Sequence, residues 1–224
     1  MNRNKVIIIG GLGNGSVIAA AIHDANDKGY DKYEVGGYLN DREEVGSEIE
    51  GFKVLGKLRD IQKFIEDGYS FIYTIYRIDG QEKRLEIFEG LNVPEDQLAI
   101  FVHPSVYLAS NVKLSSGCVL MPNVSISPGA SFGKCCLVMV NASFGHNSGC
   151  GDFCHFAAQS CIGAYCKIGK GVHIGLNATV RENLNLKNYS ALGMGSVLLK
   201  DIGEKEIWGG VPASLIRYSK NGEK

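Results

Sequence analysis

The C-terminal half of this chain places an apolar residue at every sixth position. In a six-residue frame that begins at Leu108 and continues without interruption to about Gly203, the first position of every hexad is apolar. With 45% apolar residues in the chain, chance would produce this run in one of six frames only about once in sixty thousand trials. The first positions are Leu108, Leu114, Leu120, Ile126, Phe132, Val138, Phe144, Cys150, Phe156, Ile162, Ile168, Ile174, Val180, Leu186, Leu192 and Leu198.

Small residues occupy the fifth position of nearly every hexad. Because side chains alternate across a strand, the first and fifth positions can both point inward when a corner follows each short strand. Three such strands close a triangular coil, so the pattern predicts a parallel β-helix of hexapeptide repeats. The second position is often glycine, which suits tight bends, at Gly133, Gly145, Gly151, Gly163, Gly169, Gly175 and Gly193. The fifth positions are Val112, Cys118, Val124, Ala130, Cys136, Ala142, Ser148, Cys154, Ser160, Cys166, Val172, Ala178, Ser190 and Ser196, with Leu184 and Ile202 larger.

The cysteines follow this repeat. All seven lie between Cys118 and Cys166, and five of them occupy the first or fifth position. Because both positions point inward, we predict that these five cysteines fill the core. A buried thiol is usually inert. A metal site or a nucleophile pair built from Cys150, Cys154 and His155 is disfavoured, and no second cluster has zinc-ligand spacing. We expect no metal.

The first hundred residues follow a different rule. A buried strand over Lys5–Gly10 leads through a glycine-rich turn into an Ala-rich helix that continues to about Asp27, and a second strand follows at Tyr33–Leu39. This βαβ unit predicts a Rossmann-like α/β domain with a small parallel sheet over residues 1–103, joined near His103 to a β-helix domain over residues 104–224. Further strands are predicted near Phe52–Leu55, Phe71–Tyr76 and Leu98–Val102, and helices at Leu58–Asp67 and Gln81–Leu91.

Charge narrows the choice of partners. The formal charge is −1 and the pI is about 6.5, so no basic surplus is present to bind nucleic acid or an anionic membrane surface. The apolar run that begins at Val6 is too short for a signal peptide or a membrane span. We expect a cytoplasmic protein without membrane insertion.

The glycine-rich turn is a candidate anion site. A turn between a strand and a helix presents backbone N–H groups and the positive end of the helix dipole to a phosphate. The spacing of Gly10, Gly13 and Gly15 departs from the dinucleotide fingerprint, and Asn40-Asp41 follow the second strand. A nucleotide ligand is favoured, and glycines that only permit a tight turn are the alternative. A nicotinamide-dependent oxidoreductase is disfavoured, because no hydride-transfer signature follows.

Three histidines lie on the predicted coil. His146 occupies the third position of its hexad, outside the apolar columns, where an exposed imidazole can act as a general base near neutral pH. An idle surface histidine is the alternative. His155 and His173 share the sixth position and are eighteen residues apart, so they should stack, and the spacing leaves a structural or a functional role open.

Several motifs together resemble the bacterial sugar acetyltransferases that modify sialic acid or bacillosamine-type amino sugars. They are the hexapeptide run, the glycine-rich opening, Phe144-Gly-His-Asn147, Gly151-Asp-Phe-Cys-His155, Cys166-Lys-Ile-Gly-Lys-Gly171 and Gly209-Gly-Val-Pro-Ala213. The resemblance covers nearly the whole chain. It implies a left-handed coil, a homotrimer, acetyl-CoA as co-substrate in a groove between neighbouring coils, and a nucleotide-linked amino sugar on the N-terminal domain.

The resemblance also implies roles for individual residues. His146 would be the base, and Asn147 stands where the family commonly has an acidic residue. His155 would contact the pantetheine arm, and the Ala164 N–H would hold the thioester oxygen. Leu176, Gly193 and Met194 would line the CoA groove, and Gly10, Gly13, Asn14, Gly15, Asn40 and Asp41 would meet the nucleotide, with Asn14 in place of a common histidine.

These departures favour one reaction within the family. Asn147 cannot supply a charge to orient the imidazole, and an amine needs less help than a sugar hydroxyl because it is partly free base near about pH 8. We expect N-acetylation of a nucleotide-linked deoxyamino sugar by direct attack. O-acetylation of a sialic-acid-like sugar and a non-catalytic scaffold that binds nucleotide-sugar are the alternatives.

Overall fold

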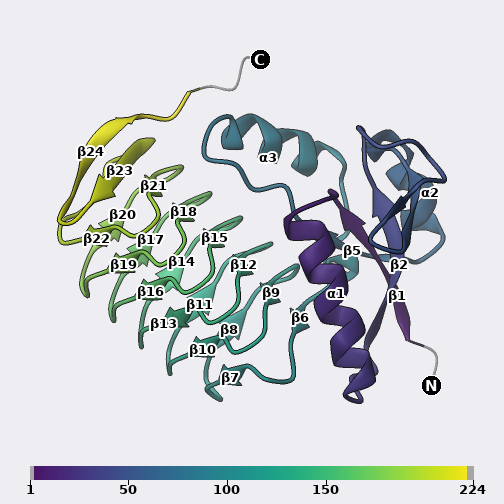
Figure 1. Cartoon of the computed structure of the whole chain (residues 1–224), viewed down its shortest axis with the longest axis horizontal. Coiled ribbons are helices and arrows are strands. Elements are labelled where there is room, and N and C mark those ends of the chain that lie inside the picture. Colours follow the sequence, from purple (N-terminus) through teal and green to yellow (C-terminus); the bar gives the residue numbers. More distant parts are fainter. Residues whose placement is uncertain (1–2, 221–224) are drawn as a thin grey trace.

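The N-terminal half forms the small α/β domain that the sequence predicts. The computed structural model describes residues 3–220 (Figure 1). Five strands lie in the order β3-β4-β2-β1-β5, parallel except for the β3–β4 hairpin, and Val6 to Ile9 of β1 are fully buried. The elements are β1 (Asn4–Ile9), α1 (Asn14–Asp27), β2 (Tyr33–Leu39), β3 (Glu48–Ile49), β4 (Phe52–Gly56), η1 (Leu58–Asp60), α2 (Ile61–Glu66), β5 (Ser70–Tyr73), α3 (Gln81–Gly90) and η2 (Glu95–Gln97).

The C-terminal half is a parallel β-helix, as the hexads predict, and the coil is left-handed, as the family resemblance implies. Each strand pairs in parallel with the strand eighteen residues further on, as Ile126 pairs with Phe144. Each hexad contributes one two-residue strand made of its sixth position and the next first position: β7 (Tyr107–Leu108), β8 (Lys113–Leu114), β9 (Val119–Leu120), β10 (Ser125–Ile126), β11 (Ser131–Phe132), β12 (Leu137–Val138), β13 (Ser143–Phe144), β14 (Gly149–Cys150), β15 (His155–Phe156), β16 (Cys161–Ile162), β17 (Lys167–Ile168), β18 (His173–Ile174), β19 (Thr179–Val180), β20 (Asn185–Leu186), β21 (Ala191–Leu192) and β22 (Val197–Leu198).

Three sheets form the sides of the coil. The first coil sheet runs from β7 to β22, the second from β8 to β20, and the third contains β9, β12, β15, β18 and β21. The third sheet begins with β6 (Phe101–Val102), which pairs with β9. The predicted strand Leu98–Val102 therefore contributes β6 to the coil, while Leu98 only bridges Phe71 of the N-terminal sheet. We call the turns from the first to the second sheet the first corner, from the second to the third the second corner, and from the third to the first the third corner.

The corners turn on left-handed residues at the fourth position of the hexads. Asn141, Asn147 and Asn177 have φ of 59°, 57° and 53°, and asparagine tolerates this conformation better than most residues. The second-position residues are glycine because of close packing between coils, and not because of the tight bends that the sequence predicts. A Cβ on Gly145 would lie 2.5 Å from the carbonyl carbon of Gly163, so glycine there permits the close approach of successive coils.

The apolar columns fill the coil. The first-position side chains from Leu120 to Leu198 are buried apart from the partly exposed Cys150, and the four fifth-position cysteines are buried. Phe144 packs between Phe132 and Phe156, with ring centroids 4.6 and 5.2 Å away. Cys118, Cys136 and Cys154, each eighteen residues from the next, lie in one buried cluster, which confirms their predicted place in the core.

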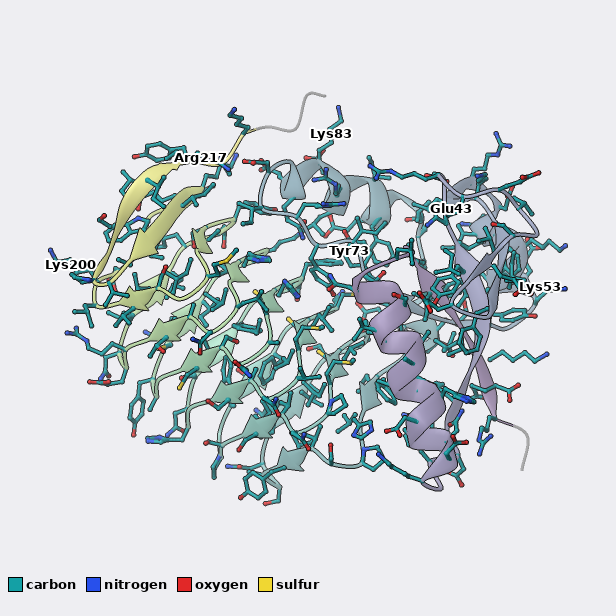
Figure 2. The ribbon with its side chains drawn as sticks, in the orientation of Figure 1. Glu43, Lys53, Tyr73, Lys83, Lys200 and Arg217 are labelled. Carbon is teal, nitrogen blue, oxygen red and sulfur yellow. The ribbon has the colours of Figure 1, made fainter. Side chains whose placement is uncertain are left out.

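The N-terminal domain packs against the third coil sheet and the second corner (Figure 1). Phe153 of the second corner meets Tyr73 and Phe88 edge-on, with centroids 5.5 and 5.7 Å apart. Tyr76 stacks on His155 at 5.2 Å, and its hydroxyl donates to the Cys135 carbonyl over 2.6 Å. Figure 2 shows Tyr73 at this junction. The two halves therefore share a continuous apolar interface.

A C-terminal hairpin closes the far end of the coil and returns to the N-terminal domain. It consists of β23 (Glu206–Gly210) and β24 (Ala213–Tyr218). Arg217, labelled on this hairpin in Figure 2, donates from two nitrogens to the two Asp79 oxygens, each over 2.8 Å. This hydrogen-bonded pair lowers the pKa of Asp79 to about 2. Among residues 3–220 no helix is long and apolar enough to cross a membrane.

Close coil stacking makes a testable distinction between two glycines. In Gly169→Ala the new Cβ would lie 2.7 Å from the backbone nitrogen of Asn188, and we expect the variant to lose about 3 kcal/mol of unfolding free energy. Gly195 has φ of 65° and open space around its Cα, so Gly195→Asn should change that free energy by less than about 0.5 kcal/mol. Urea unfolding measures both, and equal losses would contradict this account.

The stacked pair of His155 and His173 predicts acid sensitivity. Burial lowers the pKa of His173 to about 4 and that of His155 well below its ordinary value. Between about pH 6.5 and 4 the unfolded chain binds protons that the folded chain rejects, so the unfolding free energy should fall as the pH falls, by up to about 3 kcal/mol from His173. Urea unfolding at several pH values tests this. In His173→Gln the slope against pH should be shallower, and an unchanged slope would contradict the assignment.

Candidate active site

The first corner presents the candidate base to solvent. His146 and Asn147 are both exposed at the turn between β13 and β14, and Asn147 Nδ2 lies 3.1 Å from His146 Nδ1. The Tyr165 ring, from the next coil, meets the imidazole edge-on at 4.9 Å. Tyr165 is absent from the predicted site, because only the eighteen-residue stacking of the coils brings it near His146. The corner therefore holds an accessible imidazole with two fixed neighbours.

The backbone beside His146 offers a free hydrogen-bond donor. A Cβ on Gly145 would lie 2.6 Å from the Ala164 nitrogen, which places that amide directly over the corner. At the second corner, the matching third-position N–H groups of Lys134 and Lys170 donate to the Asp152 and Asn188 side chains of the next coil. Within residues 3–220 no acceptor takes the Ala164 N–H. It is therefore available to donate to an oxyanion, and its contact with the thioester oxygen stays a prediction.

His155 lies apart from His146, on the third coil sheet. It is 8% exposed, and its Nδ1 is 3.1 Å from His173 Nδ1, so the stacking predicted from the shared sixth position is confirmed. Its Nε2 is buried, with no hydrogen-bond partner in the part of the chain that the structure describes. Tyr76 covers the ring. Contact between His155 and a pantetheine arm stays a prediction.

The predicted CoA-groove residues gather at the third corner. Leu176 and Met194 are 51% and 75% exposed, and the Gly195 N–H donates to the Leu176 carbonyl over 2.8 Å. A Cβ on Gly175 would lie 2.7 Å from the Gly193 carbonyl carbon. One chain therefore brings His146, Asn147 and Ala164 together on one corner and the groove residues together on another.

The glycine-rich turn lies at the carboxyl end of β1, before helix α1. Gly13 caps the helix with φ of 96° and without a side-chain hydrogen bond, and no acidic residue lies in the first turn. Asn14 Nδ2 is 3.4 Å from the Thr74 carbonyl. A Cβ on Gly10 would lie 2.1 Å from Thr74 Oγ1, and Gly15 also packs against this hydroxyl. The glycines thus admit Thr74 beneath the turn, a residue that sequence spacing does not connect to it.

Asn40 and Asp41 both accept or donate hydrogen bonds within the domain, and Asn40 contacts the glycine-rich turn itself. Asn40 Nδ2 donates to the Gly10 carbonyl over 2.9 Å, and its Oδ1 accepts the Arg42 N–H over 2.7 Å. Asp41 Oδ1 accepts the Leu58 N–H over 2.9 Å. Asn40 therefore ties the loop after β2 to the glycine-rich turn, and Asp41 ties the same loop to the start of η1. An anion could approach the exposed end of α1 above them.

Known proteins share this fold across the whole chain. No protein-family model matches the sequence. A variant of perosamine N-acetyltransferase from Caulobacter crescentus, in complex with CoA and GDP-perosamine, superimposes with a TM-score of 0.80 at 21% identity, over 96% of this chain and 97% of that chain. The acetyltransferase domain of PglB from Neisseria gonorrhoeae, in complex with acetyl coenzyme A, gives 0.80 at 20% identity, over 96% and 100%. WeeI from Acinetobacter baumannii gives 0.77 at 18% identity, over 95% and 100%.

These likenesses define the architecture. An α/β domain followed by a left-handed β-helix recurs in all three structures with nearly complete mutual coverage. At 18–21% identity they establish the fold. The chemistry of this chain has to be argued from its own corner residues.

Proposed function

We propose that this protein is an acetyl-CoA-dependent N-acetyltransferase that modifies the amino group of a nucleotide-linked deoxyamino sugar. The observation that carries the proposal is the first corner, where the exposed His146 lies next to Asn147 and beside the free Ala164 N–H. The shared fold supports it, because the C. crescentus protein holds CoA and GDP-perosamine and the N. gonorrhoeae domain holds acetyl coenzyme A.

The corner can supply the groups that direct acyl transfer needs. The sugar amine attacks the thioester carbonyl carbon, and His146 takes the proton that the nitrogen loses. The Ala164 N–H donates to the oxygen on which negative charge develops. The tetrahedral intermediate then expels the CoA sulfur, which leaves as thiolate or takes a proton, and an amide remains on the sugar.

Asn147 permits either imidazole nitrogen of His146 to carry the ring proton. With Nδ2 donating to His146 Nδ1, the ring proton lies on Nε2. Turning the amide over presents Oδ1 to the same nitrogen, so that Nδ1 carries the proton and Nε2 keeps the lone pair that a base requires. An asparagine permits both arrangements, whereas a carboxylate would permit only the second. This freedom favours an amine over a hydroxyl as nucleophile.

The two substrates would bind to separate parts of the molecule. The nucleotide would bind the α1 terminus at Gly10, Gly13, Asn14 and Gly15, in loops held by Asn40 and Asp41. Leu176, Gly193 and Met194 would line the acetyl-CoA groove, with His155 toward the pantetheine arm. Because the groove residues and His146 lie on different corners of one coil, we propose a homotrimer in which neighbouring coils complete each site. Dependence on acetyl-CoA fits a cytoplasmic enzyme.

Removal of the base is the direct test. His146→Gln should lower kcat by about 10²- to 10⁴-fold, with the KM for acetyl-CoA changed by less than about threefold, because the base acts on the amine. CoA release with GDP- and UDP-linked 4-amino sugars measures this. His23→Gln, at an exposed histidine of α1, is the control and should keep full activity. Full activity in His146→Gln would overturn the assignment of the base.

A carboxylate next to the base should restore a fixed tautomer. Asn147→Asp keeps a residue that tolerates the left-handed backbone, and its carboxylate can only accept from Nδ1–H. We expect kcat to rise by about threefold to tenfold, with the acidic limb of the pH–rate profile moved to higher pH because the negative charge favours the imidazolium. Asn141→Asp, at the same hexad position on the third corner, should change neither. An unchanged profile in Asn147→Asp would contradict this role.

A further inference from the structure

Three thiols converge inside the coil, away from the candidate active site. The Sγ atoms of Cys136, Cys150 and Cys154 all lie within 4.8 Å of one another, and those of Cys136 and Cys150 are 3.7 Å apart. Cys136 and Cys154 occupy fifth positions on successive coils, and Cys150 occupies a first position between them. The sequence suggests His155 as a possible partner of Cys150 and Cys154. In the structure the His155 ring lies outside the coil core, and the third member of the cluster is Cys136.

Cys150 breaks the pattern of its column. Every other first position holds leucine, isoleucine, valine or phenylalanine. The fifth-position thiols have a packing role, because Cys136 and Cys154 donate to the carbonyls of Gly151 and Gly169 over 3.2 and 3.0 Å. Among the described residues the Cys150 thiol has one hydrogen-bond partner, Cys136 Sγ, and no carbonyl accepts from it. Cys150 therefore places a third sulfur at a position where the other hexads have a large aliphatic or aromatic side chain.

The three sulfurs suit a soft cation. Metal–sulfur bonds of about 2.3 Å in a trigonal arrangement need sulfurs about 4 Å apart, which agrees with the spacing of this cluster.

The cluster lies next to the second coil sheet, where Cys150 is partly exposed and is flanked by Gly149 and Gly151, which carry no side chains. We propose that Cys136, Cys150 and Cys154 bind one thiophilic d10 cation of the Zn²⁺ or Cu⁺ class as thiolates. Binding would release the thiol protons to solvent and tie two successive coils together. The site is separate from the proposed acetyl transfer and does not depend on it.

The repeat itself supplies variants that should fold. Cys150→Val places valine, already present at Val138 and Val180, in the first-position column. Cys136→Ala places alanine, already present at Ala130 and Ala142, in the fifth-position column. Cys161→Ser alters the exposed cysteine outside the cluster and is the control. Circular dichroism establishes that each variant is folded before metal is measured.

The test is metal content and affinity in the full chain. Protein purified from zinc-supplemented or copper-supplemented cells is measured by native mass spectrometry, and reduced metal-free protein is titrated with Zn²⁺ or Cu⁺ against a chromophoric chelator. We expect one ion per chain in the wild type and in Cys161→Ser, and at least a hundredfold weaker binding in Cys150→Val and Cys136→Ala. The cation that binds in these experiments, Zn²⁺ or Cu⁺, is the one that the site prefers.

Two results would overturn the proposal. One is the absence of bound metal in the wild type from both cultures and both titrations, including after refolding with the metal present. The other is stoichiometric metal that persists in folded Cys150→Val, which would place the ion elsewhere on the chain.

Discussion

The structure depends on the stacking of one coil on the next at a fixed interval of eighteen residues. Backbone N–H groups donate to the following coil, as from Gly145 to Ile162 and from Gly163 to Val180, each over 2.8 Å. The coils approach so closely that a Cβ at the second position would meet the next backbone. A single inserted residue would turn every later column from core to solvent. This constraint places Ala164 and Tyr165 over His146.

The same constraint restricts the residue beside the base. Position 147 requires a left-handed backbone, with φ of 57°, and asparagine satisfies it at low cost. The Asn147 side chain also reaches the imidazole. One residue therefore serves the backbone turn and contacts the proposed base, and its amide leaves the tautomer free to exchange. Stacking sets the position of this corner, and we propose that the Asn147 side chain sets the strength of the base.

The coil could be predicted almost completely from the sequence, because a period of six is a one-dimensional property. The columns, the stacked His155 and His173, and the exposed His146 follow from it. The sequence relates the second-position glycines to tight bends, whereas the structure shows that glycine is required there by the close stacking of successive coils. Contacts across the fold carry no periodic signal. Thr74 beneath the glycine-rich turn, the engagement of Asn40 within its loops and the approach of Cys136 to Cys150 all depend on three-dimensional packing, so the sequence could not reveal them.

The central claim is that this corner transfers an acetyl group to nitrogen. The most direct measurement is the chemical form of the product made from acetyl-CoA and a nucleotide-linked 4-amino sugar. This account predicts an added acetyl group that resists alkaline hydroxylamine and shows an amide N–H coupled to the sugar ring proton by nuclear magnetic resonance. An ester that hydroxylamine removes, or no acetylated product from either GDP-linked or UDP-linked amino sugars, would contradict it.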